Sequence, residues 1–134
     1  MRILLLLLLI NMSIFSNEDH LILKLSSKIA VKNKVIKGVD NLNNLYSIKN
    51  NELIKTSKEK TSFYRNDFYS NISSVDVKNS LKIKLFYENF NTLIILDNKL
   101  SEISKINFNL IEPGKIISKI SASNDNNIWI YNEL

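Results

Sequence analysis

Apolar and polar residues alternate with a period of two along much of the chain after residue 20, as they do in β-strands. In the segment "LKIKLFY", Leu81, Ile83 and Leu85 alternate with Lys82 and Lys84. This alternation predicts a strand with one face toward a core and the other toward water.

The segment "TLIILD" (92–97) is apolar almost throughout, which predicts a strand that is covered on both faces. Asn50-Asn51 and Asp97-Asn98 separate strand-like segments, and Asn tolerates the positive φ angles that tight hairpins need. Segments that favour a helix are few and short. The pattern therefore predicts an all-β protein of antiparallel hairpins.

Three segments of the chain resemble one another. They are "GVDNLNNLYSIK" (38–49), "SVDVKNSLKIKL" (74–85) and "KISASNDNNIWIYN" (119–132). The alignment matches Val39, Val75 and Ile120, which are separated by 36 and 45 residues. It also matches three apolar residues that follow short Asn-containing turns: Leu45, Leu81 and Ile128. A repeat of about 40 residues with four short strands is typical of a β-propeller blade.

The repeat predicts ten strands in two and a half units. The expected ranges are 35–40, 44–49, 52–57 and 61–66 in the first unit, 72–77, 81–87, 92–97 and 100–108 in the second, and 116–123 and 127–132 in the third. A propeller usually needs at least four blades to close. Three interpretations stay open: a truncated or split gene product, an open β-sheet domain that oligomerises, or a two-sheet sandwich that only mimics blades.

The first sixteen residues, "MRILLLLLLINMSIFS", have the layout of a secretory signal peptide. A positive start precedes the apolar residues 3–10, which are too few to cross a bilayer as a helix. The chain has no Cys, so a lipoprotein anchor is excluded. We expect a signal peptide at 1–16 and one β-repeat domain at 17–134, exported to the periplasm or cell envelope with no stable membrane span after cleavage.

The net charge of +5 does not by itself indicate a nucleic-acid partner. The Lys residues are scattered among apolar ones, and Lys and Asn share A/T-rich codons. A nucleic-acid surface more often has clustered Arg or a basic run with aromatic stacking partners. We therefore expect a solvated basic surface.

Candidate catalytic or metal-binding chemistry is sparse. His20 is the only histidine and has no ligand partners at metal spacing. The sequence contains no Gly-rich phosphate loop and no nucleophile motif around a serine. Asp40 and Asp76 occupy matching repeat positions, and we interpret them as caps of turns rather than paired catalytic carboxylates. The sequence thus predicts no enzyme activity, no metal and no cofactor.

Tyr46 and Trp129 share a repeat position, with Lys82 between them in the middle unit. Aromatic residues at matched positions could line one face as binding anchors, because they combine apolar area with a polar group. The alternative is that they pack between neighbouring units.

The chain resembles the N-terminal part of exported β-propeller-like proteins of flavobacteria. The resemblance depends on "NNLYSIKNNELIK", "NISSVDVKNSLKIKLFYENFNTLIILDNKLSEI" and "NNIWIYNEL", in this order after the signal peptide. It implies a propeller-like fold and supplies no catalytic residues. We expect a non-enzymatic binding or scaffolding module that contacts a protein or peptide through an exposed sheet face or edge and could oligomerise. The alternative is a truncated remnant of a larger propeller protein, without a function of its own.

Overall fold

The computed structural model describes residues 23–25, 28, 30–125 and 127–133. The predicted signal peptide (1–16) and His20 lie outside these residues. The chain divides into two compact units, 1–30 and 31–134, and the ten described strands belong to the second.

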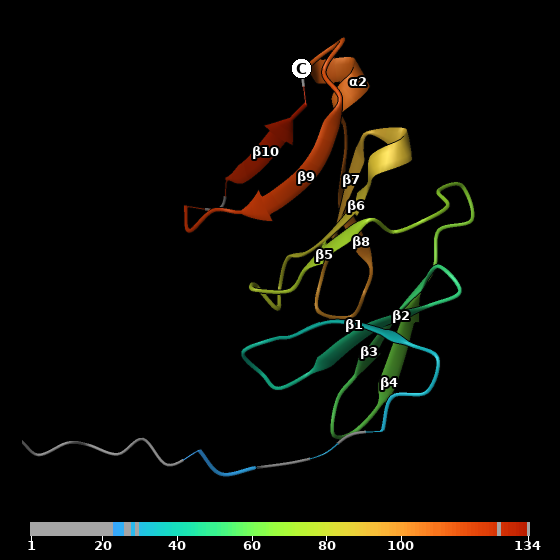
Figure 1. Ribbon diagram of the computed structural model, residues 1–134, viewed down its shortest axis with the longest axis vertical. Coiled ribbons are helices and arrows are strands. Elements are labelled where there is room, and N and C mark those ends of the chain that lie inside the picture. The colour runs from blue at the N-terminus through green and yellow to red at the C-terminus, as the bar shows by residue number, and fades with distance from the viewer. Residues whose placement is uncertain (1–22, 26–27, 29, 126, 134) are drawn as a thin grey trace, which may run out of the picture. The chain divides into compact units, whose positions relative to one another are not determined.

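The described strands form three antiparallel sheets, none of them closed, in which neighbours in sequence are neighbours in space (Figure 1). Sheet A contains β1 (Val35–Val39), β2 (Leu45–Lys49), β3 (Glu52–Thr56) and β4 (Thr61–Tyr64). Sheet B contains β5 (Ser74–Asp76), β6 (Ile83–Tyr87), β7 (Thr92–Leu96) and β8 (Glu102–Asn107), and sheet C contains β9 (Ile117–Ala122) and β10 (Ile128–Asn132). Two short helices, η1 (Glu88–Phe90) and α2 (Phe108–Ile111), follow β6 and β8. The prediction of an all-β, antiparallel protein is confirmed.

Asparagine makes the tight turn between β2 and β3. Asn50 and Asn51 have φ angles of 51° and 60°, the left-handed pair that a two-residue hairpin requires. The turn predicted at Asp97-Asn98 is also present, but its left-handed residue is Leu100, with a φ of 69°.

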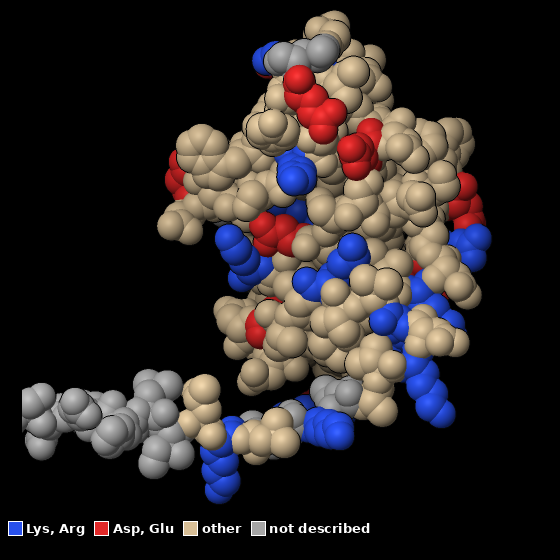
Figure 2. Space-filling view, viewed as in Figure 1, with Lys and Arg blue, Asp and Glu red and all other residues tan. Residues whose placement is uncertain are grey.

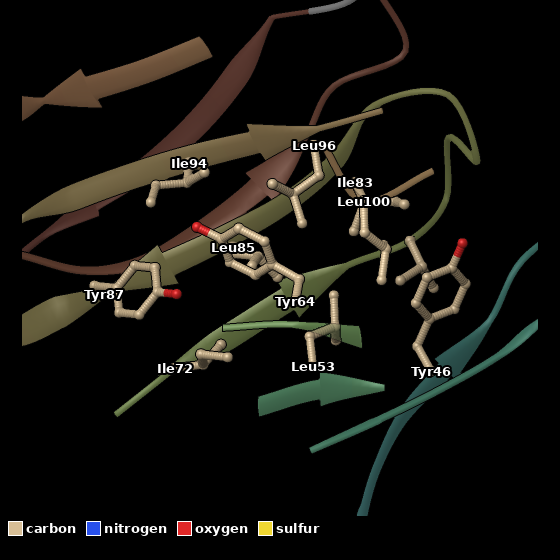
Figure 3. Close-up of a cluster of buried hydrophobic side chains, with 11 residues drawn as sticks. Tyr46, Leu53, Tyr64, Ile72, Ile83, Leu85, Tyr87, Ile94, Leu96 and Leu100 are labelled. Atoms are coloured by element: carbon tan, nitrogen blue, oxygen red, sulfur yellow. The ribbon is translucent and has the colours of Figure 1, made fainter. Parts of the chain in front are cut away.

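Sheets A and B pack face to face around a shared apolar core (Figure 3). Tyr46 and Leu53 of sheet A and Leu85 of sheet B have no exposed surface. The buried residues of this core are Tyr46, Leu53, Tyr64, Ile72, Val77, Ile83, Leu85, Tyr87, Ile94, Leu96 and Leu100. A hydrogen bond also joins the two sheets at the rim of this core: the Tyr64 hydroxyl of β4 donates to Glu102 of β8 at 2.6 Å.

Sheets B and C enclose a second, smaller core on the other face of sheet B. Its buried residues are Phe86, Leu93, Phe108 and Ile117, and Ile95, Ile106, Ile120 and Ile128 pack against them. Sheet B is therefore covered on both faces, as "TLIILD" predicted for β7.

The second strand of each sheet uses its two faces in the same way. In β6, the first, third and fifth residues lie in the core shared with sheet A, and the fourth, Phe86, lies in the core shared with sheet C. In β2 the second residue, Tyr46, lies in the core shared with sheet B. We call the face with positions 1, 3 and 5 of this strand the trailing face of the sheet, and the face with positions 2 and 4 the leading face.

Lys82 is exposed as predicted, but the prediction that Lys84 faces water and Leu81 faces the core is wrong. Leu81 is 61% exposed and precedes the strand, whereas Lys84 is only 5% exposed. The reason is that sheet C covers the leading face of sheet B, so the aliphatic stem of Lys84 is enclosed as well.

The predicted match of Leu45, Leu81 and Ile128 is also wrong at Leu81. Leu45 and Ile128 begin β2 and β10, but β6 begins at Ile83, two residues after Leu81, and the connection before it (77–82) is one residue longer than the other two. The residue of β6 that corresponds to Tyr46 and Trp129 is consequently Lys84 rather than Lys82.

The match of Val39, Val75 and Ile120 holds for the strand but not fully for the register. Each residue lies in the first strand of its sheet. Val75 and Ile120 pair with the third residue of the next strand, whereas Val39 pairs with the first, Leu45.

Candidate functional site

The first strands of the three sheets lie side by side and together line one groove. β1 contacts β5, and β5 contacts β9. Each of the three is an edge strand of its own sheet, so no strand of the described residues pairs with one row of its backbone N–H and C=O groups. The groove has a volume of about 320 Å³ and is lined by Lys37, Val39, Ser74, Val75, Asp76, Val77, Lys78, Ile120 and Ser121.

The three matched apolar residues of the sequence repeat are brought together here, because Val39, Val75 and Ile120 all line the groove. They provide an apolar wall, and the groove is also lined by two ammonium groups, Lys37 and Lys78, and one carboxylate, Asp76, which leaves it with a net positive charge. This combination of exposed strand edges, apolar wall and ammonium groups suits an extended, acidic peptide.

Asp76 joins two of these strands. Its Oδ1 atom accepts a 3.0 Å hydrogen bond from the backbone N–H of Lys78, which caps the turn after β5. Its Oδ2 atom accepts a 2.8 Å bond from the N–H of Ala122 at the end of β9. The predicted capping role is confirmed, and the link to sheet C is an addition that the sequence did not indicate.

Asp40 caps the equivalent turn of sheet A from a buried position. Its Oδ1 atom accepts hydrogen bonds of 2.9 Å from the N–H groups of Leu42 and Asn44. Its Oδ2 atom accepts bonds from the Asn44 side chain at 2.9 Å and from the Tyr46 hydroxyl at 3.0 Å. Burial alone would raise the pKa of Asp40, but these four donors together lower it below its usual value.

A third turn is capped in the same way, although the sequence repeat did not reveal it. Oδ1 of Asp97 accepts 2.8 Å bonds from the N–H groups of Lys99 and Ser101, two and four residues later. This is the spacing used by Asp40, and an Asp followed by Asn or Lys residues after an apolar strand is the signal that could have identified it. The three carboxylates are therefore structural parts of turns.

The two aromatic residues singled out in the sequence have different surroundings. Tyr46 has no exposed surface and packs between sheets A and B, as the alternative interpretation expected. Trp129 is 70% exposed on the leading face of sheet C. The structure does not bring them together as one aromatic surface.

Lys and Arg residues are interspersed with acidic and neutral residues over the face of the molecule in Figure 2. Within the described residues, no group of three or more His, Asp or Glu side chains is arranged to hold a metal ion. The described part of the chain also has no helix with the length and apolar character of a membrane span.

The groove, rather than a cluster of ionisable side chains, is thus the site with the most defined chemistry in the described residues. No protein family model, curated protein or solved structure matches the chain.

Proposed function

We propose that this chain is an exported, non-enzymatic β-repeat module of the bacterial envelope, built like part of a β-propeller, that binds a protein or peptide partner. The resemblance to exported flavobacterial propeller-like proteins and the signal-peptide layout support the location. The three successive antiparallel sheets with equivalent strands support the comparison with propeller blades.

The observation that carries the proposal is the convergence of three edge strands on one groove. An extended peptide can add its backbone hydrogen bonds to an exposed strand edge, while side-chain pockets provide specificity. In this groove Val39, Val75 and Ile120 offer apolar contacts, and Lys37 and Lys78 favour an acidic residue in the peptide.

Selection from a displayed library of random hexapeptides tests this binding. We expect acidic peptides to be enriched on the purified protein and to lose at least tenfold in affinity for the variant with both Lys37→Glu and Lys78→Glu. The matched control is Lys58→Glu, which reverses an exposed charge in the β3–β4 connection that does not line the groove. We expect this control to bind like the wild type.

Two outcomes would contradict the binding proposal. One is an absence of enriched peptides, which is also what the alternative of a remnant without its own activity predicts. The other is equal affinity for the wild type and the double variant, which would place binding outside the groove.

The location requires its own experiment. Protease added to intact cells with a permeabilised outer membrane should digest the protein while a cytoplasmic marker stays protected. Persistent full-length protein that resists the protease together with the marker would contradict export, whatever the peptide selection shows.

A further inference from the structure

The leading face of sheet C is an exposed apolar surface. Trp129 and Tyr131, the second and fourth residues of β10, are 70% and 61% exposed. They line a shallow hollow of about 280 Å³ together with Lys119, Ile120, Ser121 and Ile130. Two large aromatic side chains on one face of a strand are an unusual amount of apolar surface to leave in water.

The equivalent residues of the other two sheets are covered. Tyr46, the second residue of β2, is fully buried by the trailing face of sheet B. Phe86, the fourth residue of β6, is fully buried in the core that sheet C completes. At each of these two junctions, the leading face of one sheet meets the trailing face of the next.

The trailing face of sheet A presents exposed apolar side chains around its edge, while Ser47 and Ile54 at its centre are 1% and 3% exposed. Leu45 and Ser47, the first and third residues of β2, define this face. Val39 pairs with Leu45 and Ile36 pairs with Ser47, so both lie on it. Phe63 lies on it as well, because it pairs with Ile54, which in turn pairs with Ser47. Ile36, Val39 and Phe63 are 44%, 56% and 58% exposed. On the trailing face of sheet B, by contrast, Ile83 and Leu85 have no exposed surface.

We propose that the leading face of sheet C packs against the trailing face of sheet A in a second copy of this chain. Within one chain, sheet A packs against sheet B and sheet B packs against sheet C, each time with a leading face on a trailing face. The proposed contact would form the same kind of junction between two molecules. Since the two faces differ, the contact is heterologous, and it forms a ring or a filament according to whether the rotation closes.

This association would also extend the groove. β9 of one copy would lie beside β1 of the second, as β5 lies beside β1 and β9 beside β5 within one chain. The docking surfaces share Val39, Ile120 and Ser121 with the groove, but Trp129 and Phe63, which test the association, do not line it. The proposal does not depend on the peptide-binding function, so either one can fail without the other.

Sedimentation velocity over a range of concentrations tests the association. We expect the purified protein to form species of at least two copies, and we expect Trp129→Lys and Phe63→Lys each to weaken this association at least tenfold. Phe68→Lys is the matched control, because Phe68 is 86% exposed in a connection outside both faces, and it should associate like the wild type. Unchanged circular dichroism and urea midpoints would show that the variants are folded.

An equimolar mixture of the two variants identifies which faces meet. The Trp129→Lys copy keeps the sheet A face and the Phe63→Lys copy keeps the sheet C face, so the mixture should recover one intact junction and form a pair that neither variant forms alone. A wild type that stays monomeric at high concentration would overturn the proposal. So would association that Trp129→Lys abolishes but Phe63→Lys leaves unchanged, because this result indicates symmetric pairing of two sheet C faces.

Discussion

At the scale of single residues, acidic side chains hold the turns and one glycine permits two sheets to approach. Asp40 shows the capping of a turn most clearly, because its buried carboxylate accepts four hydrogen bonds from its own turn and from Tyr46. Charge-assisted bonds of this kind stabilise a protein only while the carboxylate is ionised.

The pH dependence of stability should report the state of Asp40. Its pKa is lowered in the folded protein, so its contribution is complete above the unfolded pKa of about 3.9 and disappears as the pH falls through the folded pKa. We expect Asp40→Asn to lower the free energy of unfolding by about 1–3 kcal/mol at pH 7, since an amide cannot accept all four bonds. Below pH 4 this difference from the wild type should shrink.

Urea unfolding at pH 7, 4 and 3 measures this difference. Glu59→Gln, at an exposed position in the β3–β4 connection, is the control and should change stability little at any pH. A difference for Asp40→Asn that stays constant from pH 7 to pH 3 would mean that the charge of Asp40 is not what stabilises the turn.

Gly38 is the residue that permits the close approach of sheet A to the connection that follows β5. It pairs with Tyr46 on the face of sheet A that meets sheet B, and a Cβ atom added to it would lie 2.9 Å from Cγ2 of Val77. Because the Val77 methyl group is buried and cannot rotate away freely, Gly38→Ala should cost about 1–3 kcal/mol.

A double-mutant cycle isolates this contact. In the protein with both Gly38→Ala and Val77→Ala, we expect the loss in unfolding free energy to be smaller than the sum of the two single losses by more than about 0.5 kcal/mol. Additive losses would show that the new methyl group does not meet Val77.

At the scale of elements, the sequence predicts where the strands are better than it predicts what covers them. Turn residues such as Asn50 and Asn51 mark the hairpins through local φ preferences, and the ten strands accordingly lie at or within two residues of most expected limits. Burial depends on neighbouring sheets that are distant in sequence, and the period of two in "LKIKLFY" contains no information about them. The groove could not be predicted for the same reason, although the repeat matched three of the apolar residues that line it, Val39, Val75 and Ile120.

The contrast between Tyr46 and Trp129 has the same origin. Both are the second residue of the second strand in their sheets, and the local sequence gives no reason to treat them differently. Tyr46 is buried because sheet B follows, whereas no described element covers Trp129.

Aspartate substitutions in and before β6 test the corrected register. Lys84→Asp should cost at least about 2 kcal/mol, because a short charged side chain at a position that is 5% exposed cannot reach water as Lys does. Lys82→Asp, outside the strand and exposed, should change stability by no more than about 0.5 kcal/mol.

Ile95→Asp is the companion variant in β7, where the side chain packs against the core of sheets B and C, and it should be as severe as Lys84→Asp. The urea midpoints of the three variants test whether sheet C covers the leading face of sheet B. Equal midpoints for Lys82→Asp and Ile95→Asp would mean that sheet C does not cover sheet B in solution.

At the scale of the whole molecule, the unequal coverage of the sheets predicts unequal stability. Sheet B shares a core with a sheet on each side, and all five residues of β6 are buried. Sheet C has two strands and one core, and β10 contains no buried residue. Local opening requires the loss of contacts, so the strands with the fewest buried apolar contacts open at the lowest free energy.

Amide hydrogen exchange should therefore rank the sheets. We expect β6 and β7 to exchange most slowly, at rates close to those of global unfolding, and β10 to exchange faster by at least tenfold. At concentrations where copies associate head to tail, the protection of β10 and of β1 should rise together, while Trp129→Lys should remove the rise at both. A rise at β10 alone would separate the two surfaces, since it would mean that whatever covers Trp129 is not the trailing face of sheet A.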